Sequence, residues 1–181
     1  MKRFIALLCV ICLGLAVSAN AAVQKGDTEV ELLGGWANIN FDVGGDVDVY
    51  GLMGSVGYFV TDAIQVSGAA MGLWIDTPVA GADVDTYGLG IRGKYHFMTD
   101  QKAVPYLGGQ LYYLTIQPGA GNDVTGLVYG PVVGLRYELN EMNDLFVEYQ
   151  LLIFGEDFDG PAIMGLDNSN LVVFGIVHQF K

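Results

Sequence analysis

Six charged residues of this 181-residue chain fall inside β-like segments whose other residues are mostly apolar or glycine. They are Glu31, Arg92, Lys94, Arg136, Glu138 and Glu148. Burying an unpaired charge is costly, so three cations and three carboxylates on the inner face of a sheet are expected to neutralise one another. These residue types therefore predict a buried set of ion pairs.

The segment VDTYGLGIRGKYHF (84–97) shows how the charges are placed, because one face carries tyrosine and leucine and the other carries glycine, Arg92 and Lys94. A two-residue period is typical of a β-strand whose two faces meet different environments. The same alternation places Arg136 and Glu138 on the inward face of 125–139 and Glu148 on the inward face of 144–154. Gln110 is expected to face inward as well. With hairpin loops of odd length, four cross-strand pairs are predicted: Arg136 with Glu148, Gly134 with Gln150, Ser55 with Ser67, and Gly57 with Gln65.

Catalysis has little support in the sequence. After the first 21 residues only two histidines remain, His96 on the inward face and His178 on the outward face. Neither has a serine or an acid at a spacing that suggests a proton relay. We therefore predict a non-enzymatic protein with no catalytic residue, no cofactor and no dedicated metal site.

Eight β-rich segments alternate with turn-rich ones, and no apolar 3.6-residue period persists long enough for a helix. The predicted strands span 28–40, 49–59, 63–75, 84–97, 103–115, 125–139, 144–154 and 169–180. The connections alternate between short ones (60–62, 98–102 and 140–143) and long ones (41–48, 76–83, 116–124 and 155–168). This alternation places all short turns at one end of an up-and-down sheet.

The length of the predicted strands favours a membrane location, because each is long enough to cross a bilayer at a tilt, for which about 9–11 residues are needed. Outward aromatic residues also gather near both strand ends, as expected at two lipid–water interfaces. They are Tyr50, Trp74, Tyr87, Tyr113 and Tyr129 at the long-loop end, and Tyr58, Tyr95, Phe97, Tyr137 and Phe180 at the short-turn end. We predict an all-β, eight-stranded antiparallel up-and-down transmembrane β-barrel at 22–181.

The first 21 residues predict a cleaved signal peptide, with a basic start, an apolar stretch and an Ala-x-Ala site ending at Ala21. Both cysteines, Cys9 and Cys12, lie inside it, so no disulfide is expected afterwards. The remainder has 6 basic and 20 acidic residues, a formal charge of −14. That charge excludes binding to nucleic acid through phosphates.

The interior of an eight-stranded barrel is only just wide enough for its own side chains. The polar lumen is therefore interpreted as a neutralised plug, with a polar pore as the alternative, and inward glycines provide room for the long charged side chains. Most of the negative charge falls in the long loops, where GEDFDG (155–160) is the best candidate for divalent cations. The alternative is a solvated acidic rim.

Two stretches resemble a known family. AVPYLGGQLYYL (103–114) is similar to a strand common in the OmpA-like β-barrel family, which includes OmpX-like and OmpW-like small barrels. LVVFGIVHQF (171–180) resembles the C-terminal strand that the barrel-assembly machinery recognises, although Lys181 follows the usual terminal phenylalanine. The resemblance implies structural, adhesive or small-solute-transport roles. We expect a monomeric barrel of the bacterial outer membrane, in contact with outer-membrane lipid and lipopolysaccharide.

Three functions remain open on this evidence. The first is a plugged barrel for envelope integrity or surface interaction, with its acidic loops meeting an extracellular ligand or divalent cations. The second is a narrow channel for small or hydrophobic solutes, as in the OmpW-like barrels. The third is a soluble periplasmic barrel that binds a ligand.

Overall fold

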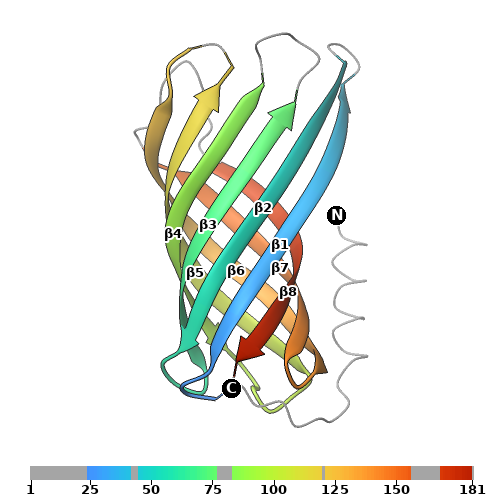
Figure 1. Ribbon diagram of the computed structural model, residues 1–181, viewed down its shortest axis with the longest axis vertical. Helices are drawn as coiled ribbons and strands as arrows, with labels where there is room; N and C mark the ends of the chain where they lie inside the picture. Colours follow the sequence, from blue (N-terminus) through green and yellow to red (C-terminus); the bar gives the residue numbers. More distant parts are fainter. Residues whose placement is uncertain (1–23, 42–44, 77–82, 120, 156–167, 181) are drawn as a thin grey trace.

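The computed structural model describes residues 24–41, 45–76, 83–119, 121–155 and 168–180, and these form a closed antiparallel barrel (Figure 1). The strands are β1 (Thr28–Phe41), β2 (Gly45–Phe59), β3 (Ile64–Asp76), β4 (Val84–His96), β5 (Ala103–Pro118), β6 (Val124–Asn140), β7 (Asn143–Phe154) and β8 (Asn168–Phe180). Each strand pairs with the next, and β1 closes the barrel by pairing Thr28–Gly34 with Phe180–Phe174. The predicted eight-stranded up-and-down topology is confirmed, whereas the predicted signal peptide lies outside the described residues.

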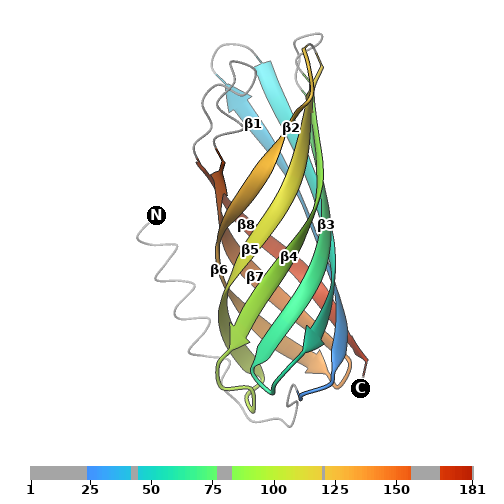
Figure 2. The same ribbon diagram turned by 90° about the vertical axis from the view of Figure 1, so that its left-hand side faces the viewer.

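The two-residue period of the sequence becomes an alternation of buried and exposed side chains. In β3 the burial alternates strictly from Ile64 to Ala70, and β7 shows the same period from Asp144 to Leu152. The strands are 12–17 residues long and strongly tilted (Figure 2). No helix in the described part of the chain is long and apolar enough to cross a membrane.

The outer surface of the barrel is an apolar belt. Leu89 and Phe174 on this face are 70% and 62% exposed, a degree of exposure that suits lipid rather than water. Nine of the ten predicted interfacial aromatics are exposed, and Tyr137 is half-buried. On neighbouring strands Tyr50 lies directly beside Trp74. The outward orientation of these aromatic residues is therefore as predicted.

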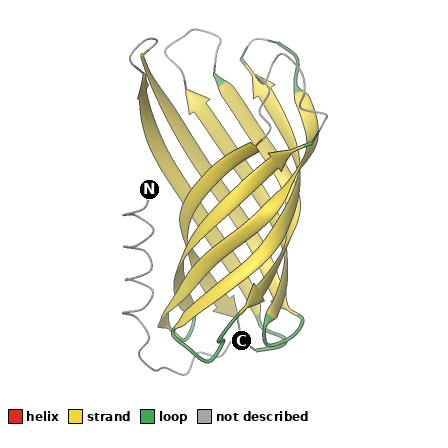
Figure 3. Ribbon diagram, turned by 180° about the vertical axis from the view of Figure 1, so that it is seen from behind, coloured by secondary structure: helices red, strands yellow, loops and turns green. Residues whose placement is uncertain are grey.

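The barrel has two distinct ends, which we call the turn end and the loop end. At the turn end β1 begins, β8 ends, and short turns connect β2 to β3, β4 to β5 and β6 to β7 (Figure 3). The prediction of a long loop at 41–48 is wrong, because β1 and β2 stay paired as far as Phe41 and Gly45. Valine and aspartate alternate from Asp46 to Val49, and this alternation extends the strand where glycine and aspartate had suggested a loop.

The β2–β3 register differs from the predicted one by two residues. Gly57 pairs with Ser67 and Phe59 pairs with Gln65, so the predicted pairs Ser55–Ser67 and Gly57–Gln65 are wrong. The Thr61 hydroxyl oxygen accepts hydrogen bonds from the amides of Ala63 and Ile64, at 3.3 and 2.9 Å. The Val60 amide also donates to the Ile64 carbonyl oxygen at 2.9 Å, so the hairpin closes around 61–63, one residue later than the pattern suggested.

The β6–β7 register also differs from the predicted one by two residues. Arg136 pairs with Phe146, and Glu148 pairs with Gly134, so the predicted pairs Arg136–Glu148 and Gly134–Gln150 are wrong. The cause is a tight turn with an adjacent register shift between Glu138 and Asn140. The Asn140 side-chain oxygen accepts hydrogen bonds from the amides of Met142 and Asn143, each at 3.1 Å, and so fixes that turn.

Candidate functional site

The polar lumen holds a first group of charges, the central cluster, formed by Glu31, Arg92, Lys94 and Glu148. The Arg92 guanidinium bridges the two carboxylates, with Nη1 at 2.9 Å from Glu31 Oε2 and Nη2 bonded to Glu148. The Lys94 ammonium is paired with Glu31 and lies 3.6 Å from Glu148 Oε2. All four side chains are almost completely buried. The structure thus joins four of the six predicted lumen residues in one balanced network.

Neutral side chains complete the hydrogen bonding of the central cluster. The Ser55 hydroxyl donates to Glu31 at 2.9 Å, and the Tyr106 hydroxyl donates to Glu148 at 3.0 Å. The Gln150 amide donates to the other oxygen of Glu148 at 2.6 Å. The Lys94 ammonium also lies 4.8 Å from the centre of the Tyr106 ring, within the range of a cation–π contact. The charges are therefore held by five strands and are not free to reorient separately.

A second group, the turn-end cluster, is formed by Arg136, Glu29 and Asp144. The Arg136 guanidinium donates to Glu29 Oε2 at 2.6 Å, and its Nε is bonded to Asp144. Gln65 also donates to Glu29, and Gln179 donates to Asp144 at 2.8 Å. All five side chains are buried. This cluster joins residues of β1, β3, β6, β7 and β8 across the full width of the barrel.

The expected balance of three cations and three carboxylates does not describe this lumen. Three buried cations meet four buried carboxylates, because Glu29 and Asp144 take part and had not been included. Glu138 lies near the turn-end cluster, but its buried Oε2 has no hydrogen-bond partner in the described part of the chain. The alternation in the sequence could have identified these two carboxylates, because Glu29 and Asp144 lie on the same inward strand faces as Glu31 and Glu148.

The inward glycines make room for large neutral side chains as well as for charges. A Cβ added at Gly90 would lie 2.2 Å from Tyr112 Cδ1, and one added at Gly134 would lie 2.3 Å from Tyr106 Cζ. A Cβ at Gly88 would similarly meet Leu114. Each of these three glycines faces a bulky partner on the neighbouring strand, and that partner occupies the space that a side chain at the glycine would need.

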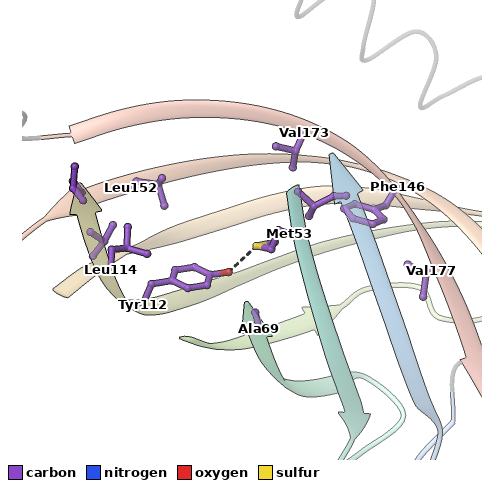
Figure 4. Close-up of a cluster of buried hydrophobic side chains, with 11 residues drawn as sticks. Met53, Ala69, Tyr112, Leu114, Phe146, Leu152, Val173 and Val177 are labelled. Atoms are coloured by element: carbon purple, nitrogen blue, oxygen red, sulfur yellow. Dashed lines mark hydrogen bonds between the residues drawn. The ribbon is translucent and has the colours of Figure 1, made fainter. Parts of the chain in front are cut away.

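Beyond the central cluster, toward the loop end, the lumen becomes apolar. We call the side chains there the apolar layer; they are Leu33, Met53, Ala69, Tyr112, Leu114, Val128, Leu152 and Val173, each at most 7% exposed. Tyr112 extends across the lumen toward Met53, and its hydroxyl lies 3.0 Å from the Met53 sulfur (Figure 4). The charged clusters therefore lie on the turn-end side of this layer, where buried Phe146 and Val177 pair directly with Arg136 and Asp144.

The two histidines lie on opposite faces of the wall. His96 is buried inside, 5.2 Å from the Phe59 ring and 5.3 Å from the Tyr106 ring, with Nε2 at 3.4 Å from the Gln65 side-chain oxygen. His178 is half-buried on the outer face, where Nδ1 lies 2.9 Å from Asn143 Oδ1.

The acidic segment proposed for cations lies mostly outside the described residues. Of GEDFDG (155–160) only Gly155 is described, and Asp42 and Asp167 are likewise outside. Among the described residues, no group of three or more His, Cys, Asp or Glu side chains is arranged to hold a metal ion.

Comparison with known proteins gives a consistent result. The family model described as "Outer membrane protein beta-barrel domain" matches residues 6–180. Neisserial surface protein A is 18% identical with a TM-score of 0.65, over 86% of this chain and all of that structure (100%). The N-terminal barrel of Pseudomonas aeruginosa OprF is 17% identical with a TM-score of 0.58, over 86% of this chain and 98% of that one.

A third solved structure, the attachment invasion locus protein Ail of Yersinia pestis, is 11% identical with a TM-score of 0.51, over 87% of this chain and 100% of that one. No curated protein matches the sequence. At these identities the three structures support the fold alone.

Proposed function

Because the chain belongs to the outer-membrane protein β-barrel domain family, we propose that it is a non-enzymatic barrel of the bacterial outer membrane with a closed lumen. Its role is then envelope integrity or surface interaction, exercised at the loop end. Outer-membrane location excludes the soluble periplasmic alternative. In barrels of this class short turns face the periplasm and longer loops face outward, which makes the turn end periplasmic.

The central cluster is the observation that carries the closed lumen. Arg92 reaches from β4 to Glu31 on β1 and to Glu148 on β7, so one buried guanidinium links strands on different sides of the barrel. A solute moving along the lumen would have to separate these charges, and breaking a buried pair leaves an uncompensated charge. This arrangement favours a plug over a narrow channel for small or hydrophobic solutes.

The proposal also includes partners. The exposed outward residues Val172, Phe174, Ile176 and Phe180 of β8 support recognition by the barrel-assembly machinery. The apolar belt supports contact with outer-membrane lipid and lipopolysaccharide. Acidic residues next to the loop end, such as exposed Asp76 and Asp85, suit an extracellular ligand or divalent cations.

Conductance of the purified, refolded protein in planar lipid bilayers tests the closed lumen. We expect the wild-type protein to show no stable single-channel openings, while heat-modifiable gel migration confirms that the barrel has folded. Stable openings of the folded wild-type protein would contradict the proposal and favour the channel.

A further inference from the structure

The apolar layer is complete around the lumen. Seven of the eight strands contribute a buried apolar side chain to it, and the eighth, β4, contributes glycine. Ala69, Gly90, Tyr112 and Val128 are successive cross-strand neighbours from β3 to β6, and Leu33 pairs with Met53. Because Tyr112 and Leu114 occupy the space that β4 leaves free, the layer has no polar side of its own.

Buried polar atoms without a hydrogen-bond partner are distributed unevenly along the lumen. Among the described residues these atoms are Ser67 Oγ, Arg92 Nε, His96 Nδ1, Gln110 Oε1, Arg136 Nη2, Glu138 Oε2 and Asp144 Oδ1. On its own strand each of them lies on the turn-end side of the apolar layer. Buried polar groups normally form a hydrogen bond with the protein or with water, so these atoms mark the positions where buried water molecules would bind.

Three of these atoms form a row across neighbouring strands. Arg92 on β4 pairs directly with Ser67 on β3 and with Gln110 on β5. The Nε–H of Arg92 is a donor, the Gln110 amide oxygen is an acceptor, and the Ser67 hydroxyl is both. Water in this row would satisfy all three groups, and the row lies one step below Ala69 and Tyr112 of the apolar layer.

A second group of these atoms surrounds a small cavity at the turn end. Arg136, Glu138 and Asp144 line this cavity, whose volume of about 10 Å³ matches the roughly 10–15 Å³ that one water molecule needs. Arg136 Nη2 can donate to that water, and the carboxylate oxygens of Glu138 and Asp144 can accept from it.

We infer that the lumen is a half-channel: water enters from the periplasmic end as far as Ser67, Arg92 and Gln110, and the apolar layer stops it and all ions. This inference rests on the closed lumen of the proposed function and identifies which part of the lumen closes it. Ion pairs tolerate water, whereas an apolar constriction gives a hydrated ion nothing in exchange for its water shell and excludes it by dewetting. The central cluster then stops solutes that cannot pass between its charges, whereas the apolar layer is the seal against small hydrated ions.

Planar-bilayer conductance of two double variants tests the seal. Met53→Ser with Tyr112→Ser makes the layer polar and shorter, and we expect resolved single-channel openings where the wild type has none. The matched control, Arg92→Ala with Glu148→Ala, removes one cation and one carboxylate and shortens both side chains below an intact layer. It should stay as closed as the wild type. Gel migration confirms folding of each variant.

Two outcomes overturn the seal: openings of the Arg92/Glu148 variant, or a folded Met53/Tyr112 variant that stays closed. Openings of the wild type itself would instead contradict the closed lumen of the proposed function, so the two failures are distinguishable.

A measurement on the wild-type protein in lipid nanodiscs is independent of how the variants fold. Nuclear magnetic resonance transfer of magnetisation from water should reach the Gln110 side-chain amide but not the methyl groups of Leu114, Val128 and Leu152. Transfer to those methyl groups, or none to Gln110, would refute the half-channel.

Discussion

At the residue scale, each charged side chain of the central cluster is stabilised by contacts with more than one partner. Arg92 serves two carboxylates from different strands, and each carboxylate has a second cation or hydroxyl partner nearby. In a low-dielectric interior such a network is favourable only while every member stays satisfied. The loss of a single member should therefore cost more than the loss of one pair on the surface.

Replacing Arg92 with methionine tests this sharing. The variant leaves Glu31 and Glu148 with Lys94 as their remaining cation, so we expect the free energy of unfolding to fall by about 3–5 kcal/mol. Urea unfolding in lipid vesicles, followed by tryptophan fluorescence, measures the change. Lys25→Met makes the same substitution at an exposed position and should change stability by less than about 0.5 kcal/mol. Similar losses for both variants would argue against the network.

At the element scale, sequence alternation predicted the strands and their inward faces but not the register between them. The period of two survives small errors in strand ends, which is why Glu31, Arg92, Lys94, Arg136 and Glu148 were all correctly turned inward. Register depends instead on how each turn is hydrogen-bonded.

Two turn side chains show why the ion-pair partners could not be predicted. The hydroxyl of Thr61 and the amide oxygen of Asn140 fix turns whose lengths the composition of the segments does not reveal. The observed β6–β7 register differs by two residues from the predicted one, which moves Arg136 away from Glu148 and toward Asp144 and thereby divides one expected cluster into two. The two-residue period shows only whether a side chain faces inward or outward, so it could not predict which residues pair with Arg136.

Glycine placement on β4 gives a prediction at this same scale, because Gly90 faces inward and Gly93 outward. A Cβ at Gly90 would lie 2.2 Å from the Tyr112 ring and 2.5 Å from the Leu111 carbonyl oxygen, whereas a Cβ at Gly93 meets nothing within 4 Å. We expect Gly90→Val to lower the urea midpoint, with a loss of about 1–3 kcal/mol from overpacking. Gly93→Val should be neutral or stabilising, since valine suits a strand. Equal effects would mean that the inward glycines are not space-making.

At the scale of the whole molecule, the barrel separates three environments. Charged and other polar groups occupy the turn-end part of the lumen, an apolar layer crosses the lumen, and an aliphatic belt bounded by aromatic residues covers the outside. A chain with strong negative charge and many apolar residues can fold only if these are kept apart. The closed β-sheet achieves this, because adjacent residues on a strand face opposite sides of the wall.

The outer belt provides the last prediction. Ile91 is 60% exposed and lies on β4 midway between the interfacial residues Tyr87 and Tyr95, so its side chain packs against lipid rather than protein. Arginine near the middle of the bilayer costs about 2–4 kcal/mol, falling to about 0–1 kcal/mol near the interface. We therefore expect Ile91→Arg to destabilise the barrel by that larger amount in lipid vesicles. Val60→Arg, at the turn end, should cost little, because Val60 is exposed beyond the end of β2. Since neither substitution removes a buried contact, a similar cost at both positions would show that the belt does not lie in the membrane as its aromatic borders indicate.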